Sequence, residues 1–227
     1  GTNMIYTDVS QNAAHFLSIA TELTEEVDWE QERKHVLELW RVSGISKYMS
    51  GLYDEAEAYF NKGLAFAQTI DEKLILYNEK VLFYSSLSSD LKVDINIRKA
   101  LKTTSEALRL VNIELKEDVS LAVILKEYSL LNLALRKRPI EQPIHLKKNE
   151  DETVHLILEI LLNVSGSALV IDEKLFTWIT IRSIRLILKH GDVDFASIIY
   201  SNYASILMGG FNDTKRSYQF GVLSIQH

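Results

Sequence analysis

Apolar residues recur along this chain at the three- and four-residue spacing of an α-helix, almost without interruption. Strict alternation of apolar and polar residues, which would indicate strands, is essentially absent. The pattern predicts about ten helices, and only two prolines and nine glycines are available to interrupt them. The expected helices span residues 10–26, 29–50, 54–69, 72–88, 91–111, 118–136, 151–165, 173–190, 193–208 and 213–226.

Residues typical of a helix start precede several of these segments. Asp54 with Glu57, and Asp28 with Gln31, have the spacing of a capping box, in which two side chains each accept a hydrogen bond from a free backbone amide. Side chains that could cap three further helices are those of Asp71, Asp172 and Asp192.

The links between helices divide the chain. The short links "MSGLYD", "KHGDVD" and "MGGFND" are typical of turns between antiparallel neighbours. The one long interruption, at 136–151, holds both prolines and has no clear period. We therefore expect one continuous helical domain with an N-terminal helical-repeat half at 1–136, a proline-containing loop at 137–150 and a C-terminal helical-repeat half at 151–227.

Residues 40–64 combine small and aromatic residues at the spacing of the tetratricopeptide signature. This spacing serves the close packing of a helix pair, since Gly44 and Ala56 lack bulk and are expected to face each other. Gly51 is expected to end the first helix in a left-handed conformation, and Gly63 to let the next helix approach. The aromatic residues expected to fill the remaining space are Trp40, Tyr53 and Phe60.

Two weaker copies of this signature follow in the C-terminal part. The residues of the first are Gly191, Val193, Ala196 and Tyr200, and those of the second are Gly209, Phe211, Thr214, Tyr218 and Gly221. Because the copies do not keep a constant period, the predicted fold class is all-α, an irregular tetratricopeptide-like antiparallel helical-repeat array, or superhelix. A compact helical bundle is the alternative, since any bundle contains small and aromatic residues at these spacings.

The composition narrows the classes of function. Hydrophobic residues make up 47% of the 227, which fits a folded chain with a substantial core. The absence of cysteine excludes disulfides, thiolate zinc sites and a cysteine nucleophile, and fits a cytoplasmic protein. The net charge of -6 argues against nucleic acid and anionic membranes as partners. The longest apolar runs, such as "VHLILEILLNV", are interrupted by Glu159 and Asn163 and are too short to span a bilayer.

No arrangement of residues in the sequence indicates catalysis, so we expect no catalytic residue, no cofactor and no metal. The glycine-rich phosphate-binding motifs are missing, and no histidine pair has metal-ligand spacing with a third ligand. His155 and Glu159 share one helical face, where a hydrogen bond is the ordinary interpretation and an acid–base or metal pair the alternative. The acidic segment 21–32 indicates a solvated surface or, alternatively, a docking surface. The basic residues at 136–138 lack the aromatic platforms of a nucleic-acid site.

Five segments of the chain occur in the order found in a known family: "AAHFLSIATELT", "EAEAYFNKGLAFAQTIDEKLILYNEKVLFYSS", "ALRLVNIELKED", "ILKHGDVDFASIIYSNYASIL" and "SYQFGVLSIQ". They resemble the helical segment of large bacterial signalling ATPases. In that family an AAA-type P-loop ATPase, often preceded by a serine/threonine-kinase-like domain, is followed by such a segment, a GAF sensor domain and often a histidine kinase.

The resemblance implies a non-catalytic scaffold and transmission module of a bacterial signal-transduction protein, linking an ATPase switch to a sensor or kinase output. Its partners would be neighbouring domains of the parent protein or other proteins. The alternative is a ligand-sensing helical-repeat arm of an ATPase-type transcription activator. In that case a groove would be lined by tyrosines such as Tyr48, Tyr77, Tyr84, Tyr200 and Tyr203.

The last expected helix has an unusual apolar stripe. Tyr218, Val222 and Ile225 fall on one face, and the helix has no polar outer surface. Helical repeats bury their apolar faces on their neighbours and need a polar element at each end. We therefore expect the chain to be a segment of a longer protein and to self-associate weakly through this end.

Overall fold

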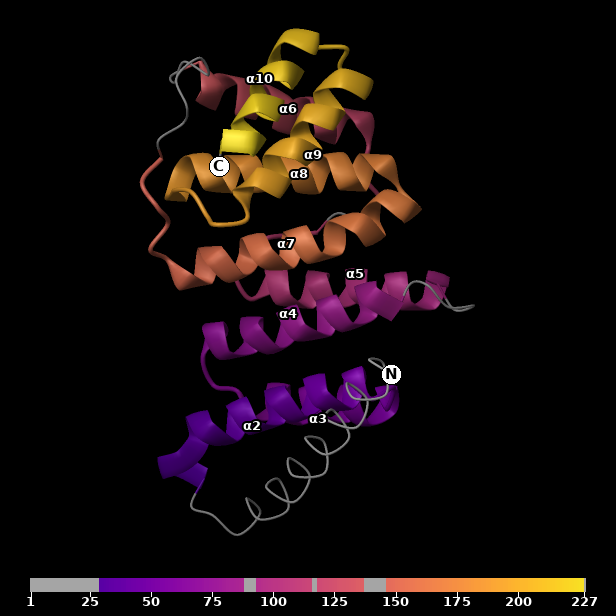
Figure 1. Ribbon diagram of the computed structural model, residues 1–227, viewed down its shortest axis with the longest axis vertical. Helices are drawn as coiled ribbons and strands as arrows, with labels where there is room; N and C mark the ends of the chain where they lie inside the picture. The colour runs from indigo at the N-terminus through magenta and orange to yellow at the C-terminus, as the bar shows by residue number, and fades with distance from the viewer. Residues whose placement is uncertain (1–28, 88–92, 116–117, 137–145, 227) are drawn as a thin grey trace, which may run out of the picture.

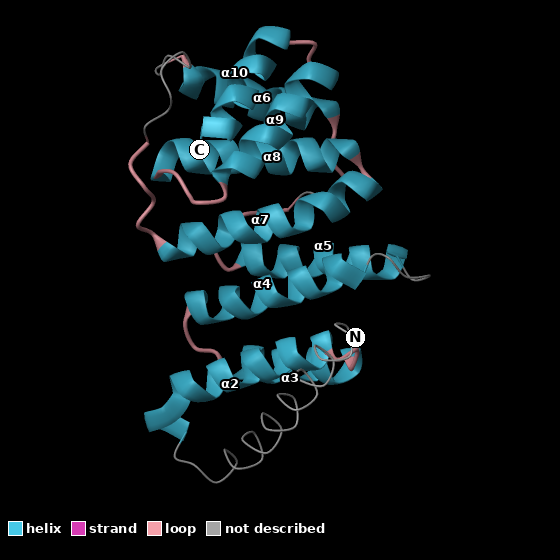
Figure 2. Ribbon diagram, in the orientation of Figure 1, coloured by secondary structure: helices cyan, strands magenta, loops and turns pink. Residues whose placement is uncertain are grey.

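The computed structural model describes residues 29–87, 93–115, 118–136 and 146–226. Across these ranges the chain forms nine helices and no strand, apart from an isolated bridge between Lys148 and Asp192. The helices are α2 (Trp29–Met49), α3 (Tyr53–Phe66), α4 (Ile70–Ser86), α5 (Val93–Arg109), α6 (Leu121–Leu135), α7 (Glu152–Ile171), α8 (Glu173–His190), α9 (Ala196–Gly209) and α10 (Thr214–Gln226). The all-α prediction is confirmed (Figure 2), while the helix expected at 10–26 lies outside the described residues.

Eight of these helices form four pairs that stack along the long axis of the molecule (Figure 1). The pairs are α2 with α3, α4 with α5, α7 with α8, and α9 with α10. Helix α4 joins the first three pairs because it contacts α2, α3 and α7, and α8 joins the last pair through α9. Short links inside three of the pairs return the chain in the opposite direction, as expected for antiparallel neighbours.

Helix α6 departs from this order. It follows α5 in the chain but packs on α8, beside the corner between α9 and α10 (Figure 1). The Tyr128 and Phe211 rings stack with centroids 4.0 Å apart, and the Arg216 guanidinium donates hydrogen bonds to Tyr128 and Asn132. The expected boundary between two halves therefore does not follow the packing, because an element from 1–136 completes the core of 151–227.

The core is continuous and its centre lies at α7 and α8. One cluster of buried hydrophobic residues extends from Ala56 to Leu223, and a small second cluster lies around Trp40 and Leu76. Helix α7 buries ten residues and α8 nine, more than any other helix over the described residues. These two helices are therefore covered on several sides, as an apolar helix requires.

Helix α7 is longer than the sequence pattern predicted. It continues past the expected end at residue 165 to Ile171, through Gly166, whose position is exposed and helical. One glycine in a helix costs only about 1 kcal/mol relative to alanine, which the packing of α7 on α4, α5 and α8 outweighs.

The prediction that this apolar run is too short to span a bilayer is wrong on length. Of the described residues, one helix, α7 with 20 residues, is long and apolar enough to do so. However, 56% of its apolar window is buried inside the protein. Length and composition do not distinguish a membrane span from a core helix, and the contacts of α7 are those of a core helix.

The expected helix starts are correct in part. Asp172 caps α8, since its carboxylate accepts a hydrogen bond from the Lys174 amide at 2.8 Å. The predicted box of Asp54 and Glu57 is wrong because α3 begins one residue earlier, after Leu52, which makes no side-chain cap. Asp28, in the other expected box, lies outside the described residues.

Two further caps differ from the prediction. Thr69, not Asp71, caps α4, and it forms a capping box with Glu72 in which both reciprocal hydrogen bonds are present. Asp192 does not cap α9, which begins four residues later, at Ala196. Its carboxylate instead accepts hydrogen bonds from the Val193 amide and the Tyr200 hydroxyl, both at 3.1 Å.

Candidate functional site: the cleft between α2 and α4

The expected packing residues of the first helix pair lie mainly at helix contacts. Trp40 is buried and its ring meets Phe66 edge-on, with centroids 5.3 Å apart. Gly44 lies against Phe60, because a Cβ added at Gly44 would be only 2.6 Å from the Phe60 ring. The partner of Gly44 is therefore primarily this ring and not Ala56, although Ala56 is fully buried.

The remaining residues of this signature have separate roles. Gly51 has a φ of 77° and ends α2, as expected. Gly63 faces α4, since an added Cβ would lie 3.0 Å from Leu76, so the prediction that Gly63 allows close approach of the next helix is confirmed. Phe60 is buried against Phe83, whereas Tyr53 is 41% exposed and its ring lies at the edge of the pair, with its centroid 6.2 Å from that of Tyr48 on α2.

The two weaker copies share only part of this packing. Ala196 and Tyr200 are buried. Gly191, with a φ of 114°, packs against the loop that precedes α7, because an added Cβ would lie 2.5 Å from the Lys147 carbonyl oxygen. It therefore serves a loop contact and not a contact between two helices.

Most residues of the last copy of the signature, at 209–221, make no close helix contact. An added Cβ at Gly209 or Gly221 would meet no atom within 4 Å, and Tyr218 is 74% exposed. Phe211 is partly buried through its stacking on Tyr128 of α6. Because α10 has no following helix among the described residues, the expected close packing at these glycines is absent.

The tyrosines proposed to line a ligand groove do not do so. Tyr84, Tyr200 and Tyr203 are buried in the main core, and Tyr48 and Tyr77 pack against it while partly exposed. These five side chains are distributed over α2, α4 and α9, and none of them lines either of the two cavities described below. Their burial favours a packing role, and the ligand-sensing alternative stays a prediction.

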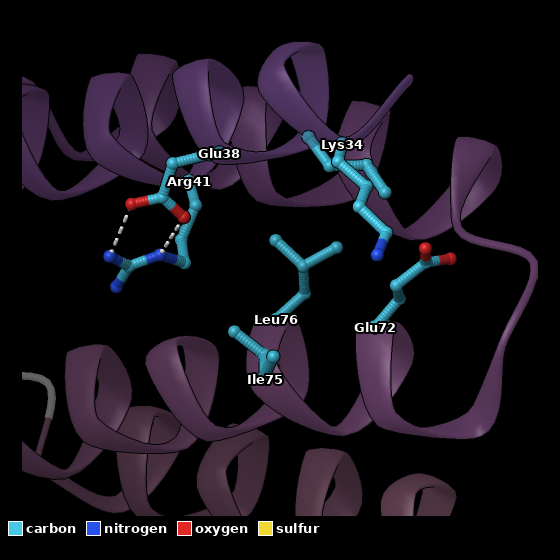
Figure 3. A pocket seen from close by; sticks show the side chains of 7 residues that line it. Lys34, Glu38, Arg41, Glu72, Ile75 and Leu76 are labelled. Carbon is cyan, nitrogen blue, oxygen red and sulfur yellow. Dashed lines mark hydrogen bonds and ion pairs between the residues drawn. The ribbon is translucent and has the colours of Figure 1, made fainter. Parts of the chain in front are cut away.

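A cleft of about 230 Å³ opens between α2 and α4. Its floor is apolar and is formed by Leu37 from α2 and by Ile75 and Leu76 from α4. Figure 3 shows these α4 side chains between charged groups, with the Lys34 ammonium and the Glu72 carboxylate pointing toward each other at one end. Leu37 and Leu76 belong to the small second core cluster, so the cleft floor is the outer surface of that cluster.

Two ion pairs connect the helices on either side of this floor. The Arg33 guanidinium lies 2.6 Å from a Glu72 oxygen, and two turns along α2 the Arg41 guanidinium bonds to Glu79. Arg41 also bonds to Glu38 on its own helix at 2.8 Å (Figure 3). The two pairs fix the distance between α2 and α4, so the apolar floor stays open between them.

The carboxylates in and beside the cleft have pKa values shifted in different directions. Burial would raise the pKa of Glu72, but hydrogen bonds from Arg33 and from the Thr69 and Gln68 amides outweigh burial and lower this pKa to about 2. The hydrogen bond from Arg41 lowers the pKa of Glu38. Burial raises the pKa of Glu79 despite its bond to Arg41. At neutral pH the rim of the cleft thus carries both signs of charge above an apolar floor.

This arrangement suits binding better than chemistry. An apolar floor with charged groups of both signs at its rim can hold an apolar side chain and pair with charges beside it. Over the described part of the chain, no group of three or more histidines and carboxylates lies together in a way that could hold a metal ion. His155, which the sequence placed beside Glu159, packs edge-on against Phe195 with ring centroids 5.1 Å apart.

The sequence reasoning missed the four residues that connect the helices: Arg33, Arg41, Glu72 and Glu79. A usable signal was present, because the arginines are eight residues apart and the glutamates seven, so each pair repeats after two helical turns. Comparison with known proteins adds no assignment: no protein-family model, curated protein or solved structure matches the chain.

Proposed function

We propose that this chain is a non-catalytic helical scaffold that acts by protein–protein contacts, and that the α2–α4 cleft holds a segment of a partner protein. The observation that carries the proposal is the cleft itself, in which an apolar floor lies open between two interhelical ion pairs. Peptide segments are commonly recognised by an apolar anchor in a groove with charge pairing beside it.

The packing order supports a tetratricopeptide-like array. In such arrays each helix pair contacts mainly the next one, and the first helices of successive pairs lie side by side along a binding surface. The contacts of α2 with α4 and of α4 with α7 follow that order. In this proposal α6 is an additional helix on the second helix of the third pair, which makes the superhelix irregular.

The cellular context proposed for the scaffold follows from the resemblance to bacterial signalling ATPases. The chain would transmit the state of an ATPase switch to a sensor or kinase output in the cytoplasm. Its cleft would bind a neighbouring domain of the parent protein or a separate partner, and the apolar stripe of α10 would support weak self-association. Tyr218 and Ile225 of that stripe are 74% and 86% exposed.

The proposal is tested with peptides selected from a random displayed library on the purified chain. We expect enriched peptides with an apolar residue flanked by charges, binding at micromolar affinity in a fluorescence-anisotropy titration. Lys34→Glu and Ile75→Ser should each weaken binding at least about tenfold, equivalent to 1.4 kcal/mol. Lys215→Glu, an exposed change on α10, is the matched control and should bind as the wild type does.

Two results would contradict the proposal. One is a selection that enriches no peptide. The other is a set of peptides that bind Lys34→Glu, Ile75→Ser and the control with the same affinity, since these peptides would then bind elsewhere on the chain.

A further inference from the structure

A second cavity, of about 330 Å³, lies between α6 and α8, at the other end of the molecule from the α2–α4 cleft. Helix α6 contributes Leu130 and Ala134 to its lining, and α8 contributes Leu186. Two arginines and a lysine of α8 complete its charged side: Arg182, Arg185 and Lys189. The cavity thus combines one apolar wall with one strongly basic wall.

The basic wall is a single face of α8. Positions 182, 185 and 189 are related by three and four residues, which places their side chains above one another on the helix. The Glu127 carboxylate of α6 neutralises Arg185 through a short ion pair. No hydrogen bond or ion pair is formed by Arg182 or Lys189 with any described residue, so two positive charges remain at the cavity.

Arg182 places an unpaired cationic group at the cavity. Its Nε–H is buried and has no acceptor among the described residues. This atom is closed off from solvent and from the cavity, so a ligand would meet the rest of the guanidinium, because Arg182 lines the cavity. An anionic acceptor there would form charge-assisted hydrogen bonds with this unpaired cation.

The apolar wall defines the rest of the ligand. Leu130 is 37% exposed and Ala134 and Leu186 are partly exposed, so a hydrocarbon segment lying on them would bury their surface. We propose that the α6–α8 cavity binds a small amphiphilic anion, whose carboxylate or phosphate head pairs with Arg182 and Lys189 and whose apolar body lies on Leu130, Ala134 and Leu186.

Binding at this position would connect two parts of the fold. Helix α6 is held on one side by α8 and on the other by the hydrogen bonds from Arg216 near the start of α10. An anion between α6 and α8 would tie these helices together and thereby brace the α9–α10 corner. This inference is independent of the proposed function of the α2–α4 cleft.

Octanoate and octyl phosphate are the probes that test the proposal, with 1-octanol and inorganic phosphate as partial ligands. We expect octanoate or octyl phosphate to bind the full chain in calorimetry with a submillimolar Kd, and to raise the melting temperature. The stronger of the two identifies the head group. Octanol and inorganic phosphate should each bind at least about tenfold more weakly, because each lacks one half of the ligand.

Arg182→Gln removes the central charge and should weaken binding of the stronger probe at least about tenfold. Lys189→Gln, at an exposed position, should also weaken it, and serves if Arg182→Gln does not fold. Arg98→Gln, an exposed arginine on α5, is the matched control and should leave the affinity unchanged. The proposal is overturned if neither amphiphile binds at about 10 mM, or if Lys189→Gln and Arg182→Gln both bind the stronger probe as tightly as the control does.

Discussion

The α7–α8 pair and the α2–α4 contact show two different ways to join helices in one fold. The buried residues of α7 and α8 are mostly apolar, and most of their buried hydroxyls bond to their own helix, as Ser183 does to the Ile179 carbonyl. Between α2 and α4 the helices are connected by Arg33–Glu72 and Arg41–Glu79, and a cleft remains open between these pairs.

The difference shows where this fold can carry recognition. Apolar side chains that interdigitate leave no space and specify a stable centre. Ion pairs of long side chains hold two helices at a fixed distance and leave apolar surface uncovered between them. Buried apolar surface is therefore concentrated at α7 and α8, and the two proposed binding sites lie toward the ends of the stack.

The largest expected effect is on the free energy of unfolding, when one leucine is replaced by alanine in α7 and one beside the α2–α4 cleft. Leu161→Ala in α7 empties a fully buried site and should lower the free energy of unfolding by about 3–5 kcal/mol. Leu37→Ala should cost less, about 2 kcal/mol, because Leu37 is buried but borders the cleft and so has fewer packing contacts to lose. Urea denaturation monitored by circular dichroism measures both, and equal losses would contradict the proposed difference.

Replacement by alanine should change the stability of the protein in opposite directions at two glycines. Gly44→Ala places a methyl group 2.6 Å from the Phe60 ring and should destabilise the protein by about 1–3 kcal/mol through overpacking. Gly166→Ala in α7 meets no atom within 4 Å and should stabilise by about 0.5–1 kcal/mol, since alanine is the better helix former. The melting temperatures of the two variants measure both effects. A Gly44→Ala variant that melts at the wild-type temperature would show that α2 and α3 do not need this close contact.

The last expected effect depends on pH and vanishes in acid. The pKa of Glu72 is lowered from 4.5 to about 2 in the folded protein, so its stabilising contribution is complete above pH 4.5 and is lost as pH falls through 2. Glu72→Gln should therefore cost about 1–2 kcal/mol at pH 7 and progressively less toward pH 2.

Denaturation of the wild type and Glu72→Gln at several pH values measures this difference. Glu150→Gln is the control, because Glu150 forms an exposed pair with Lys147 in which both side chains are at least 75% exposed. A difference between wild type and Glu72→Gln that stays constant from pH 7 to 2 would show that hydrogen bonding by this side chain matters and its charge does not.

Particular residues show how far sequence reasoning reaches. Gly51 ending α2, Asp172 capping α8 and Gly63 facing the next helix were predictable, because each depends on backbone conformation or on residues close in the chain. The start of α4 was placed wrongly because Thr69 and Asp71 are both good caps, and only the path of the chain from α3 selects between them.

The α2–α4 cleft and the α6–α8 cavity could not be predicted from the sequence. Arg33 and Glu72 are 39 positions apart, and Glu127 and Arg185 are 58 apart. Nothing near either residue in the sequence identifies its partner. The cavity lined by Leu130 and Arg182 exists only because α6 packs on α8.

The sequence by itself determined that the chain is helical, where most helices begin and end, and which small residues allow close contact. These properties follow from spacing, capping and backbone freedom, which act over a few residues. Only the tertiary structure decided that α6 leaves its place in chain order to pack on α8, and that ion pairs hold a cleft open between α2 and α4. Helices with apolar faces have many possible partners, and the choice among them depends on the fit of whole surfaces distant in sequence.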